Sequence, residues 1–318
     1  MDAGADATGT TGGEPAGNTV IELRGLVKHY GKVEAVKGID LTVRKGEIFG
    51  FLGPNGAGKT TTIRVLMDFI RKTAGEVRVL GRDPSQGSLE IRRRVGYLPG
   101  EFGLYEALRV EDFLLYLLDL GGAMDKEPRM RALAETFDLH LDRRIRELSK
   151  GNRQKVGLVQ AFMHEPELVI LDEPTSGLDP FMQQRFYKLA REEQRAGRTI
   201  FMSSHLLAEV EHICDRVAVI REGRLVLVDR ISELKDRVGK VLTVTFNDRV
   251  LPDDLRLEGV EDLTSENNTY KMTVHEDIDQ VIKRLASFSI QSMTVETFSL
   301  EELFLAMYSE EEGGGDAG

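Results

Sequence analysis

The chain has 318 residues, 41% of them hydrophobic, and a formal net charge of −11, so it can bury a packed core beneath an acidic surface. An acidic surface disfavours a long electrostatic contact with DNA or RNA, which needs a basic face, and we therefore expect no nucleic-acid partner. The single cysteine, Cys214, excludes an internal disulfide and is expected to be a small core residue.

The N-terminal part of the chain predicts a tail followed by an antiparallel sheet. Residues 1–18 contain no apolar segment of the kind found in a signal peptide, and we predict that they are disordered. From Val20 to about Gly46, short runs such as GIDLTV are typical of β-strands. Residues 47–52 (EIFGFL) then predict a buried strand, and residues 62–70 (TIRVLMDFI) predict a helix.

A phosphate-binding loop is predicted between that strand and that helix. Residues 53–61 (GPNGAGKTT) fit the pattern G-x-x-x-x-G-K-[ST]. The glycines allow backbone N–H groups to point at phosphate oxygens, and the N-terminus of the helix adds partial positive charge. Lys59 is expected to reach the β- and γ-phosphates, and the Thr60 hydroxyl is expected to hold Mg²⁺. The residues predicted to bind the phosphates of ATP are Gly53, Pro54, Asn55, Gly56, Ala57, Gly58, Lys59, Thr60 and Thr61.

The segment of about residues 88–165 has a mostly helical pattern. A second buried strand, which ends in two carboxylates, is predicted after it. In ELVILDEP, residues 167–174, four apolar residues predict a buried strand that ends at Asp172 and Glu173. Beside a phosphate loop, Asp172 is placed to fix Mg²⁺ through a bound water. Glu173 is placed to deprotonate a water that attacks the γ-phosphate.

The remaining elements predict the end of one domain and a second, smaller one. A helix at residues 180–196 and a strand at 199–204 precede a short helix and two strands joined across 222–223. Residues 231–310 alternate strands with helices and predict a separate α+β module, followed by a tail at 311–318. No apolar run approaches the roughly 20 residues of a membrane helix, so any membrane-spanning part is expected to be another chain.

Residues 147–155 (ELSKGNRQK) carry a resemblance to a known family. LSKGN resembles the LSGGQ signature of ATP-binding cassette (ABC) ATPases, and LVILDE, SGLD at residues 176–179 and His205 follow in the order of that family. The resemblance implies an α/β P-loop NTPase fold over residues 19–230. That fold has a RecA-like core, an antiparallel β subdomain and an inserted helical subdomain, here at about 88–165.

The family resemblance also implies roles for single residues. Ser149 and the backbone of Gly151 would bind the γ-phosphate held by a second subunit, across a head-to-tail dimer. Asp179 would couple the two sites of that dimer. His205 would hydrogen-bond the γ-phosphate and hold Glu173, and together with Lys59 these two residues would form the catalytic set.

Tyr30 matches the position of the family's aromatic residue that stacks on adenine. The face of an aromatic ring can stack on any purine base. A core tyrosine at the end of a strand is the alternative interpretation of this residue.

One position departs from the family's pattern. Gly100 in VGYLPGEFGLYE occupies the place of a glutamine that normally joins the Mg²⁺ shell and links nucleotide to a membrane partner. Two hypotheses replace it: water completes the Mg²⁺ shell, or the neighbouring Glu101 becomes a ligand. Contact with a membrane partner could still be made by Phe102, Leu104 and Tyr105.

The resemblance therefore implies the ATP-hydrolysing subunit of an ABC transporter, which acts as a homo- or heterodimer with a separate permease at the cytoplasmic face of the membrane. The C-terminal TFSLEELFLAMY is similar to the tail of ABC-2-type drug and antibiotic exporter ATPases, which favours export. The alternatives are a soluble ABC ATPase of translation or DNA repair, and a catalytically silent nucleotide-binding module. Two cassettes in one chain, or a long coiled coil, would have favoured the soluble class.

Overall fold

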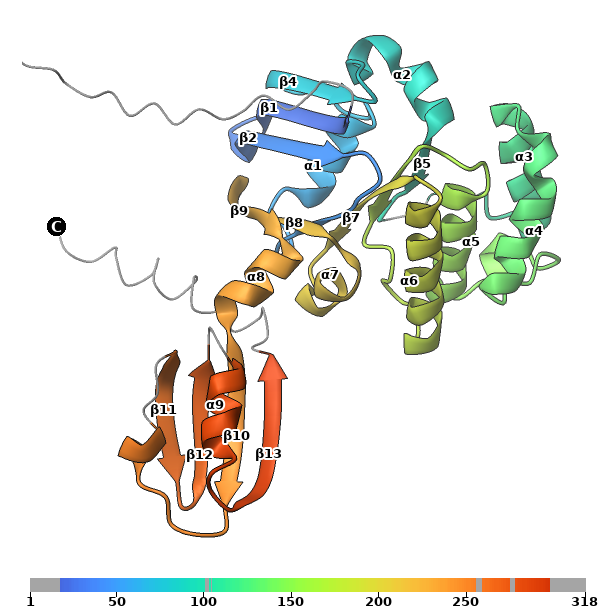
Figure 1. The fold of residues 1–318 in the computed structure, drawn as a ribbon. Coiled ribbons are helices and arrows are strands. Elements are labelled where there is room, and N and C mark those ends of the chain that lie inside the picture. Colours follow the sequence, from blue (N-terminus) through green and yellow to red (C-terminus); the bar gives the residue numbers. More distant parts are fainter. Residues whose placement is uncertain (1–17, 101–102, 104, 256–258, 275–277, 298–318) are drawn as a thin grey trace, which may run out of the picture.

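The structure is a computed structural model, and it describes residues 18–100, 103, 105–255, 259–274 and 278–297. Its described residues form three sheets and the helices that pack on them (Figure 1). The tails predicted at residues 1–18 and 311–318 lie outside the described residues, apart from Asn18. The same is true of the helix expected from the sequence SLEELFLAMYS.

The largest sheet has six strands in the order β5-β6-β7-β3-β8-β9. Its first five strands are parallel and β9 is antiparallel to β8. Both faces of β3 and β6 are buried, which explains why these two segments are apolar without alternation. The strands are β3 (Ile48–Leu52), β5 (Val95–Leu98), β6 (Leu168–Asp172), β7 (Thr199–Ser204), β8 (Arg216–Arg221) and β9 (Arg224–Arg230).

The order of the central strands fixes the place of the functional residues. Strand β7 lies between β6 and β3, with Ser203 paired to Asp172 and Ser204 paired to Leu52. The three strands are parallel, so the phosphate loop, which follows Leu52, meets the ends of β6 and β7 at one edge of the sheet. Ligands bind at this carboxyl edge in open α/β sheets.

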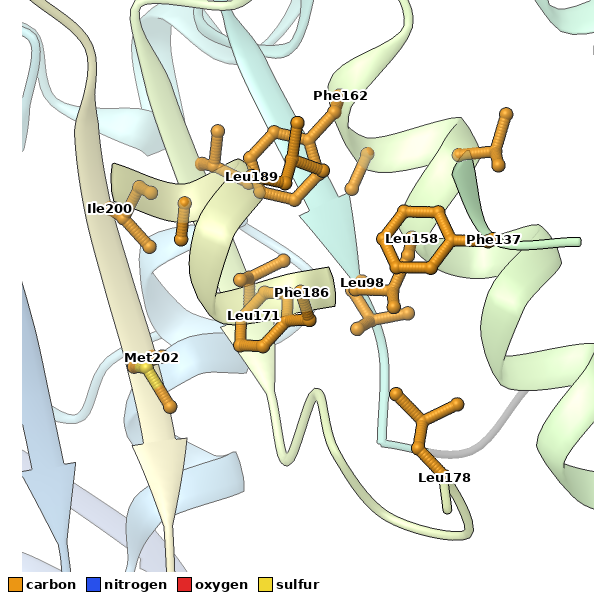
Figure 2. Close-up of a cluster of buried hydrophobic side chains, with 14 of the residues drawn as sticks. Leu98, Phe137, Leu158, Phe162, Leu171, Leu178, Phe186, Leu189, Ile200 and Met202 are labelled. Atoms are coloured by element: carbon orange, nitrogen blue, oxygen red, sulfur yellow. The ribbon is translucent and has the colours of Figure 1, made fainter. Parts of the chain in front are cut away.

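Helices and short 3₁₀ turns surround the six-stranded sheet. The cassette helices are α1 (Lys59–Leu66), α2 (Pro84–Arg94), α3 (Val110–Gly121), α4 (Glu127–Thr136), α5 (Lys150–Phe162), α6 (Pro180–Arg195), α7 (Leu207–Ile213) and α8 (Ile231–Val238), with 3₁₀ turns η1 (Met124–Lys126) and η2 (Ile145–Glu147). Figure 2 shows side chains of α5 and α6, among them Phe162 and Phe186, packed against Leu171 and Ile200 of the sheet. This apolar core thus packs against β6 and β7, the strands that end at Asp172 and Ser204.

The antiparallel sheet predicted before the phosphate loop is present, with one strand more than expected. Strands β1 (Thr19–Tyr30) and β2 (Val33–Arg44) pair with each other, and β4 (Ala74–Val79) joins the other side of β1. β4 was not predicted because only two of its six residues are buried, so its sequence carries little apolar signal. The inner face of this sheet shares a core with α1 and with Phe49 and Phe51 of β3.

The segment 88–165 predicted as a helical subdomain is not helical throughout. Strand β5 lies inside it and pairs in parallel with β6, so it belongs to the central sheet. A four-residue apolar strand cannot be distinguished by periodicity from a piece of a buried helix, and that is why the predicted boundary began too early. The helical part begins after β5, with α3.

The C-terminal module is an α+β unit with its own core, as the sequence predicts. Its sheet has the order β11-β12-β10-β13 and helix α9 packs on it, with Leu242, Phe246 and Leu285 among the buried residues. The elements are β10 (Lys240–Phe246), η3 (Pro252–Leu255), β11 (Val260–Glu266), β12 (Thr269–Val274), α9 (Ile278–Leu285) and β13 (Ile290–Thr297).

The boundary predicted at residue 231 falls too early, because α8 packs on the cassette. Ile231 and Leu234 are buried in the same apolar cluster as Val217 and Ile213 of the cassette. The Ile231 backbone N–H also donates to the Asp215 carbonyl at 3.0 Å. An amphipathic helix at a domain junction does not reveal from sequence which core it covers, and the structure assigns α8 to the cassette.

This assignment predicts different stabilities for two truncated chains. A chain that ends at Gly239 should unfold at the same temperature as the cassette in the full-length chain. A chain that ends at Arg230 should have a free energy of unfolding lower by about 3–6 kcal/mol. The reason is that the burial of Ile231 and of Leu234 contributes about 1.5–3 kcal/mol each. Thermal unfolding measures both. Equal stability of the two truncated chains would contradict the placement of α8.

Candidate active site

The phosphate loop turns between the end of β3 and the start of α1 in space that admits only glycine at two positions. A Cβ on Gly53 would lie 2.3 Å from the Ile220 carbonyl oxygen, and one on Gly58 would lie 2.7 Å from the Ala35 carbonyl oxygen. Gly58 also has a φ of 114°, in the region that favours glycine. The β1–β2 hairpin and β8 therefore press directly on the loop and fix its shape.

Lys59 is the first residue of α1, and its side chain folds back over the phosphate loop. Only 5% of Lys59 is exposed, and its Nζ donates to the carbonyls of Gly53 at 2.7 Å and Pro54 at 3.1 Å. Burial lowers the pKa of Lys59, while the nearby Glu173 and Asp172 oppose this shift. The ammonium thus lies at the loop, 3.7 Å from Glu173 Oε1.

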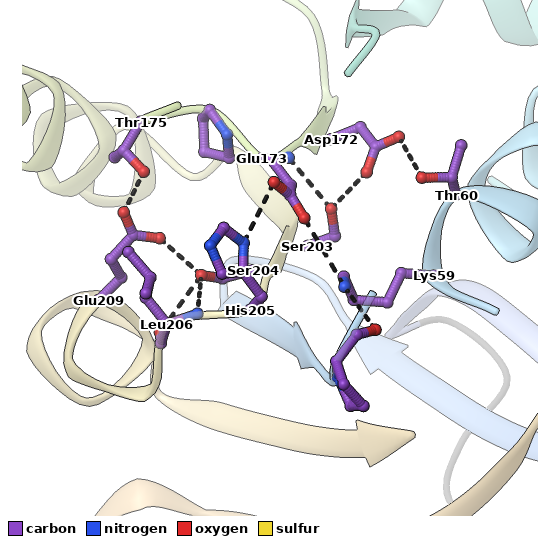
Figure 3. Close-up of polar contacts among 12 residues, drawn as sticks. Lys59, Thr60, Asp172, Glu173, Thr175, Ser203, Ser204, His205, Leu206 and Glu209 are labelled. Carbon is purple, nitrogen blue, oxygen red and sulfur yellow. Dashed lines mark hydrogen bonds and ion pairs between the residues drawn. The ribbon is translucent and has the colours of Figure 1, made fainter. Parts of the chain in front are cut away.

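The structure brings together Thr60 and Asp172, the two residues predicted to hold Mg²⁺ (Figure 3). The Thr60 hydroxyl donates to Asp172 Oδ2 at 2.9 Å, and the buried Ser203 hydroxyl donates to Asp172 Oδ1 at 2.5 Å. Hydroxyl and carboxylate oxygens are the ligands that Mg²⁺ prefers, and it binds them together with substrate phosphates. Among the described residues, no group of three or more His, Cys, Asp or Glu could hold a metal alone. The donors present therefore fit a Mg²⁺ shared with a nucleotide.

Glu173 and His205 face each other across the end of the sheet. His205 Nδ1 lies 3.2 Å from Glu173 Oε2, and the Glu173 backbone N–H donates to Ser203 Oγ at 3.1 Å. Glu173 has a φ of 51°, an uncommon conformation for a residue with a side chain, and such strained residues cluster at functional sites. The three residues predicted as catalytic, Lys59, Glu173 and His205, are thus side by side (Figure 3).

A pocket of about 300 Å³ opens beside these residues. Its lining is Thr60, Arg64, Tyr97, Pro99, Gly100, Asp172 and Glu173. Burial and the nearby Asp172 raise the pKa of Tyr97 to about 12, so its hydroxyl stays protonated. A Cβ on Gly100 would lie 3.1 Å from Asp172 Oδ2, and the backbone at this position is therefore close to the predicted metal ligand. Glu101, Phe102 and Leu104 lie outside the described residues, so the choice between water and Glu101 stays open.

Tyr30 is not a core residue. It ends β1, with 45% of its surface exposed, and Lys28 Nζ lies 5.1 Å from the centre of its ring. The same hairpin carries Ala35, whose carbonyl abuts Gly58 of the phosphate loop. An exposed ring on the hairpin that abuts the loop is consistent with the predicted stacking on adenine.

Ser149, Gly151 and Asp179 do not join this cluster. Ser149 caps α5 by accepting from the Asn152 backbone N–H at 3.3 Å, and Asp179 caps α6 by accepting from Met182 N at 3.0 Å. None of the three lines the pocket around Thr60 and Asp172. A Cβ on Gly151 would lie 2.5 Å from the Gly177 carbonyl, so the signature segment packs tightly on the loop that leads to Asp179.

Sequence reasoning missed three polar residues that hold the site together. The buried Gln154 of α5 donates through Nε2 to the carbonyls of Glu173 at 3.1 Å and Pro174 at 2.9 Å. Ser203 bridges Asp172 and the Glu173 backbone. Glu209 accepts hydrogen bonds from Thr175, two residues after Glu173, and from Ser204, directly before His205. Their only signal in the sequence is a polar side chain at a position where the periodicity of the element predicts burial.

Comparison with known proteins identifies the family. The family model described as "ABC transporter" matches residues 36–176. The linearmycin resistance ATP-binding protein of Bacillus subtilis is 30% identical over 90% of this chain and 97% of its own length. The bacitracin transport ATP-binding protein of Bacillus licheniformis is 37% identical over 73% of this chain and 76% of its own length.

A solved ATP-binding subunit of an ABC transporter shares the cassette fold with a TM-score of 0.65 and 31% identity, over 68% of this chain and 92% of that one. No helix among the described residues is long and apolar enough to span a bilayer. These relatives give no support to a role in translation or DNA repair. The chain therefore belongs to the ABC transporter family as an ATP-binding subunit, an ATPase whose hydrolysis powers transport.

Proposed function

We propose that this chain binds MgATP at the phosphate loop and hydrolyses it with Glu173 as the general base, and that this reaction drives the export of drugs or other small molecules. The observation that carries the proposal is the convergence of Lys59, Thr60, Asp172, Glu173 and His205 at the carboxyl ends of β3, β6 and β7. These residues supply a cation, two oxygen ligands, a base and a residue that holds the base.

The geometry supports a division of labour in hydrolysis. Glu173 takes a proton from water as the water oxygen bonds to the γ-phosphorus and the bond to the β–γ bridging oxygen breaks, which yields ADP and phosphate. Lys59 and the loop N–H groups neutralise charge on the phosphates. Thr60 and Asp172 would hold Mg²⁺, which polarises the phosphoryl oxygens. His205 fixes the orientation of Glu173 and hydrogen-bonds the γ-phosphate.

The segments that do not reach the pocket are assigned to a second subunit's nucleotide. Ser149 and Gly151, at the N-terminus of α5, would bind the γ-phosphate held by the partner in a head-to-tail homo- or heterodimer, since a helix N-terminus attracts anions. Asp179 would couple the two sites from the start of α6.

Contact with the permease is assigned to the helical part of the cassette. Tyr105 and Tyr116 are exposed, and their rings pack at 6.3 Å in an edge-on arrangement. Exposed aromatic residues are enriched at protein interfaces, which supports this face as the docking surface. Bound there to its permease, the chain would lie at the cytoplasmic side of the membrane.

The similarity to a bacitracin transport protein and a linearmycin resistance protein supports export. Accumulation of the exported compound in cells tests this part of the proposal. In cells that contain the chain and its permease, Glu173→Gln should raise accumulation of the exported compound. Accumulation equal to that of wild-type cells for every compound whose efflux requires the permease would contradict ATP-driven export.

The adenine assignment predicts a large effect of Tyr30 on affinity alone. Tyr30→Ala should raise the Kd for ATP by roughly 5- to 150-fold, because stacking of a base on an aromatic ring contributes about 1–3 kcal/mol. Tyr30→Phe keeps the ring and should bind ATP like the wild type. Titration of a fluorescent ATP analogue measures both. Equal affinities of the Ala and Phe variants would show that the base binds elsewhere.

A further inference from the structure

Glu209 is a buried carboxylate on α7 that none of the proposed steps uses. Only 6% of the residue is exposed, yet its two oxygens have separate partners. Oε1 accepts from the Thr175 hydroxyl, and Oε2 accepts from the Ser204 hydroxyl at 2.6 Å. Burying a carboxylate is costly unless it is hydrogen-bonded, and bonds to a charged acceptor are among the stronger ones in proteins. The two hydrogen bonds therefore tie Glu209 to the segment after Glu173 and to the end of β7.

Those two partners stand next to the residues proposed to act in hydrolysis (Figure 3). Thr175 follows Glu173 by two positions, and Ser204 immediately precedes His205. The Ser204 hydroxyl also accepts from the Leu206 backbone N–H at 2.9 Å, so it closes the turn that carries His205. With the contact of 3.2 Å between His205 and Glu173, the contacts form a closed ring from Glu173 through Glu209 and back.

Packed side chains do not enclose this ring on every side. A cavity of about 230 Å³ lies against it, and Glu173, Thr175, Ser204, His205 and Glu209 all line that cavity. The segments that carry Thr175 and His205 thus border space into which they can shift when the bridge through Glu209 is removed. Displacement of about 1 Å in a reacting group costs on the order of 100-fold in rate.

We propose that Glu209 is a positioning residue for ATP hydrolysis: it sets the separation of Glu173 and His205 by bridging Thr175 and Ser204. The inference rests on the roles proposed above for Glu173 and His205. Glu209 does not line the pocket beside Asp172, and its two side-chain hydrogen bonds go to Thr175 and Ser204. Its effect is therefore on the chemical step and not on ATP binding.

A competing explanation is that Glu209 serves only as an acid in the first turn of α7, where negative charge is favourable. Glutamine distinguishes the two explanations. Its oxygen can accept from Thr175 while its amide donates to Ser204, whose hydroxyl then turns to the Leu206 carbonyl at 3.2 Å. Glu209→Gln keeps the bridge and removes the charge, whereas Glu209→Ala removes both.

The test measures kcat and KM for ATP by phosphate release in the intact protein, with thermal unfolding as a control for folding. Glu209→Ala should lower kcat by roughly 10- to 100-fold and change KM by less than about threefold, while Glu209→Gln should keep most of the rate. Glu211→Ala is the matched control, because Glu211 lies on the same helix but pairs with Lys235 at 3.0 Å. It should leave kcat unchanged.

Thr175→Val provides a second route if Glu209→Ala does not fold, since it removes one hydroxyl and keeps the side-chain shape. It should lower kcat in the same direction with KM preserved. A wild-type kcat in folded Glu209→Ala or in Thr175→Val overturns the proposal, as does a loss in Glu209→Gln equal to that in Glu209→Ala. Glu173→Gln, measured in parallel, distinguishes failure of the positioning role of Glu209 from failure of Glu173 as the base. If that variant is inactive while Glu209→Ala is normal, only the positioning role fails; if it turns over normally, the proposed base fails and the positioning role with it.

Discussion

Glu173→Gln is expected to lower kcat for ATP hydrolysis by about 10²–10⁴-fold while ATP still binds. The amide has nearly the shape of the carboxylate but cannot take a proton from water. The contacts around it support a specific effect: Glu173 lies 3.7 Å from Lys59 Nζ and 3.2 Å from His205 Nδ1, and its backbone is fixed by Ser203. Phosphate release and equilibrium ATP binding measure the two parts of this prediction.

Glu192→Gln is the control for that substitution. Glu192 lies on α6 and pairs only weakly with Lys188, at 3.9 Å, so the same chemical change there should leave turnover intact. A Glu173→Gln protein that hydrolyses ATP at the wild-type rate would show that another group accepts the proton.

Lys59→Ala is expected to weaken ATP binding by roughly 10- to 150-fold, which corresponds to the loss of one charge-assisted hydrogen bond of about 1.5–3 kcal/mol, and to abolish measurable turnover. The alanine removes a buried ammonium that lies over the loop carbonyls of Gly53 and Pro54, where the phosphates are expected. Isothermal titration with ATP and a phosphate-release assay measure the two effects.

Lys188→Ala is the control for this variant, because Lys188 is a highly exposed lysine on α6. It should bind ATP with the wild-type Kd. Wild-type affinity and turnover in the Lys59→Ala protein would contradict the assignment of the phosphate loop.

The parts of the site that the sequence predicts are contiguous motifs. The residues of the loop at 53–61 are consecutive in the sequence. Four apolar residues before Asp172 and Glu173 predict the strand that these two carboxylates follow. Each motif lies at the end of a parallel strand, and because ligands bind at the carboxyl edge of such sheets, the sequence predicts that the two motifs share one site.

The parts that the sequence does not predict depend on contacts between distant residues. Thr175 and Glu209 are 34 residues apart in the chain, and Gln154 meets Glu173 from a distance of 19 residues. A lone polar residue on a buried helix face does not reveal its partner. The same reason explains the missed boundary: α8 is amphipathic, and only the burial of Ile231 and Leu234 shows which core it joins.

Analysis of retained nucleotide tests the central claim most directly. Wild type, Glu173→Gln and Lys59→Ala are each incubated with MgATP and passed through a desalting column, and the bound nucleotide is then identified by ion-exchange chromatography. We predict ADP on the wild type, unhydrolysed ATP on Glu173→Gln and little nucleotide on Lys59→Ala. ADP on Glu173→Gln in the same amount as on the wild type would contradict the claim that Glu173 activates the water for hydrolysis at this phosphate loop.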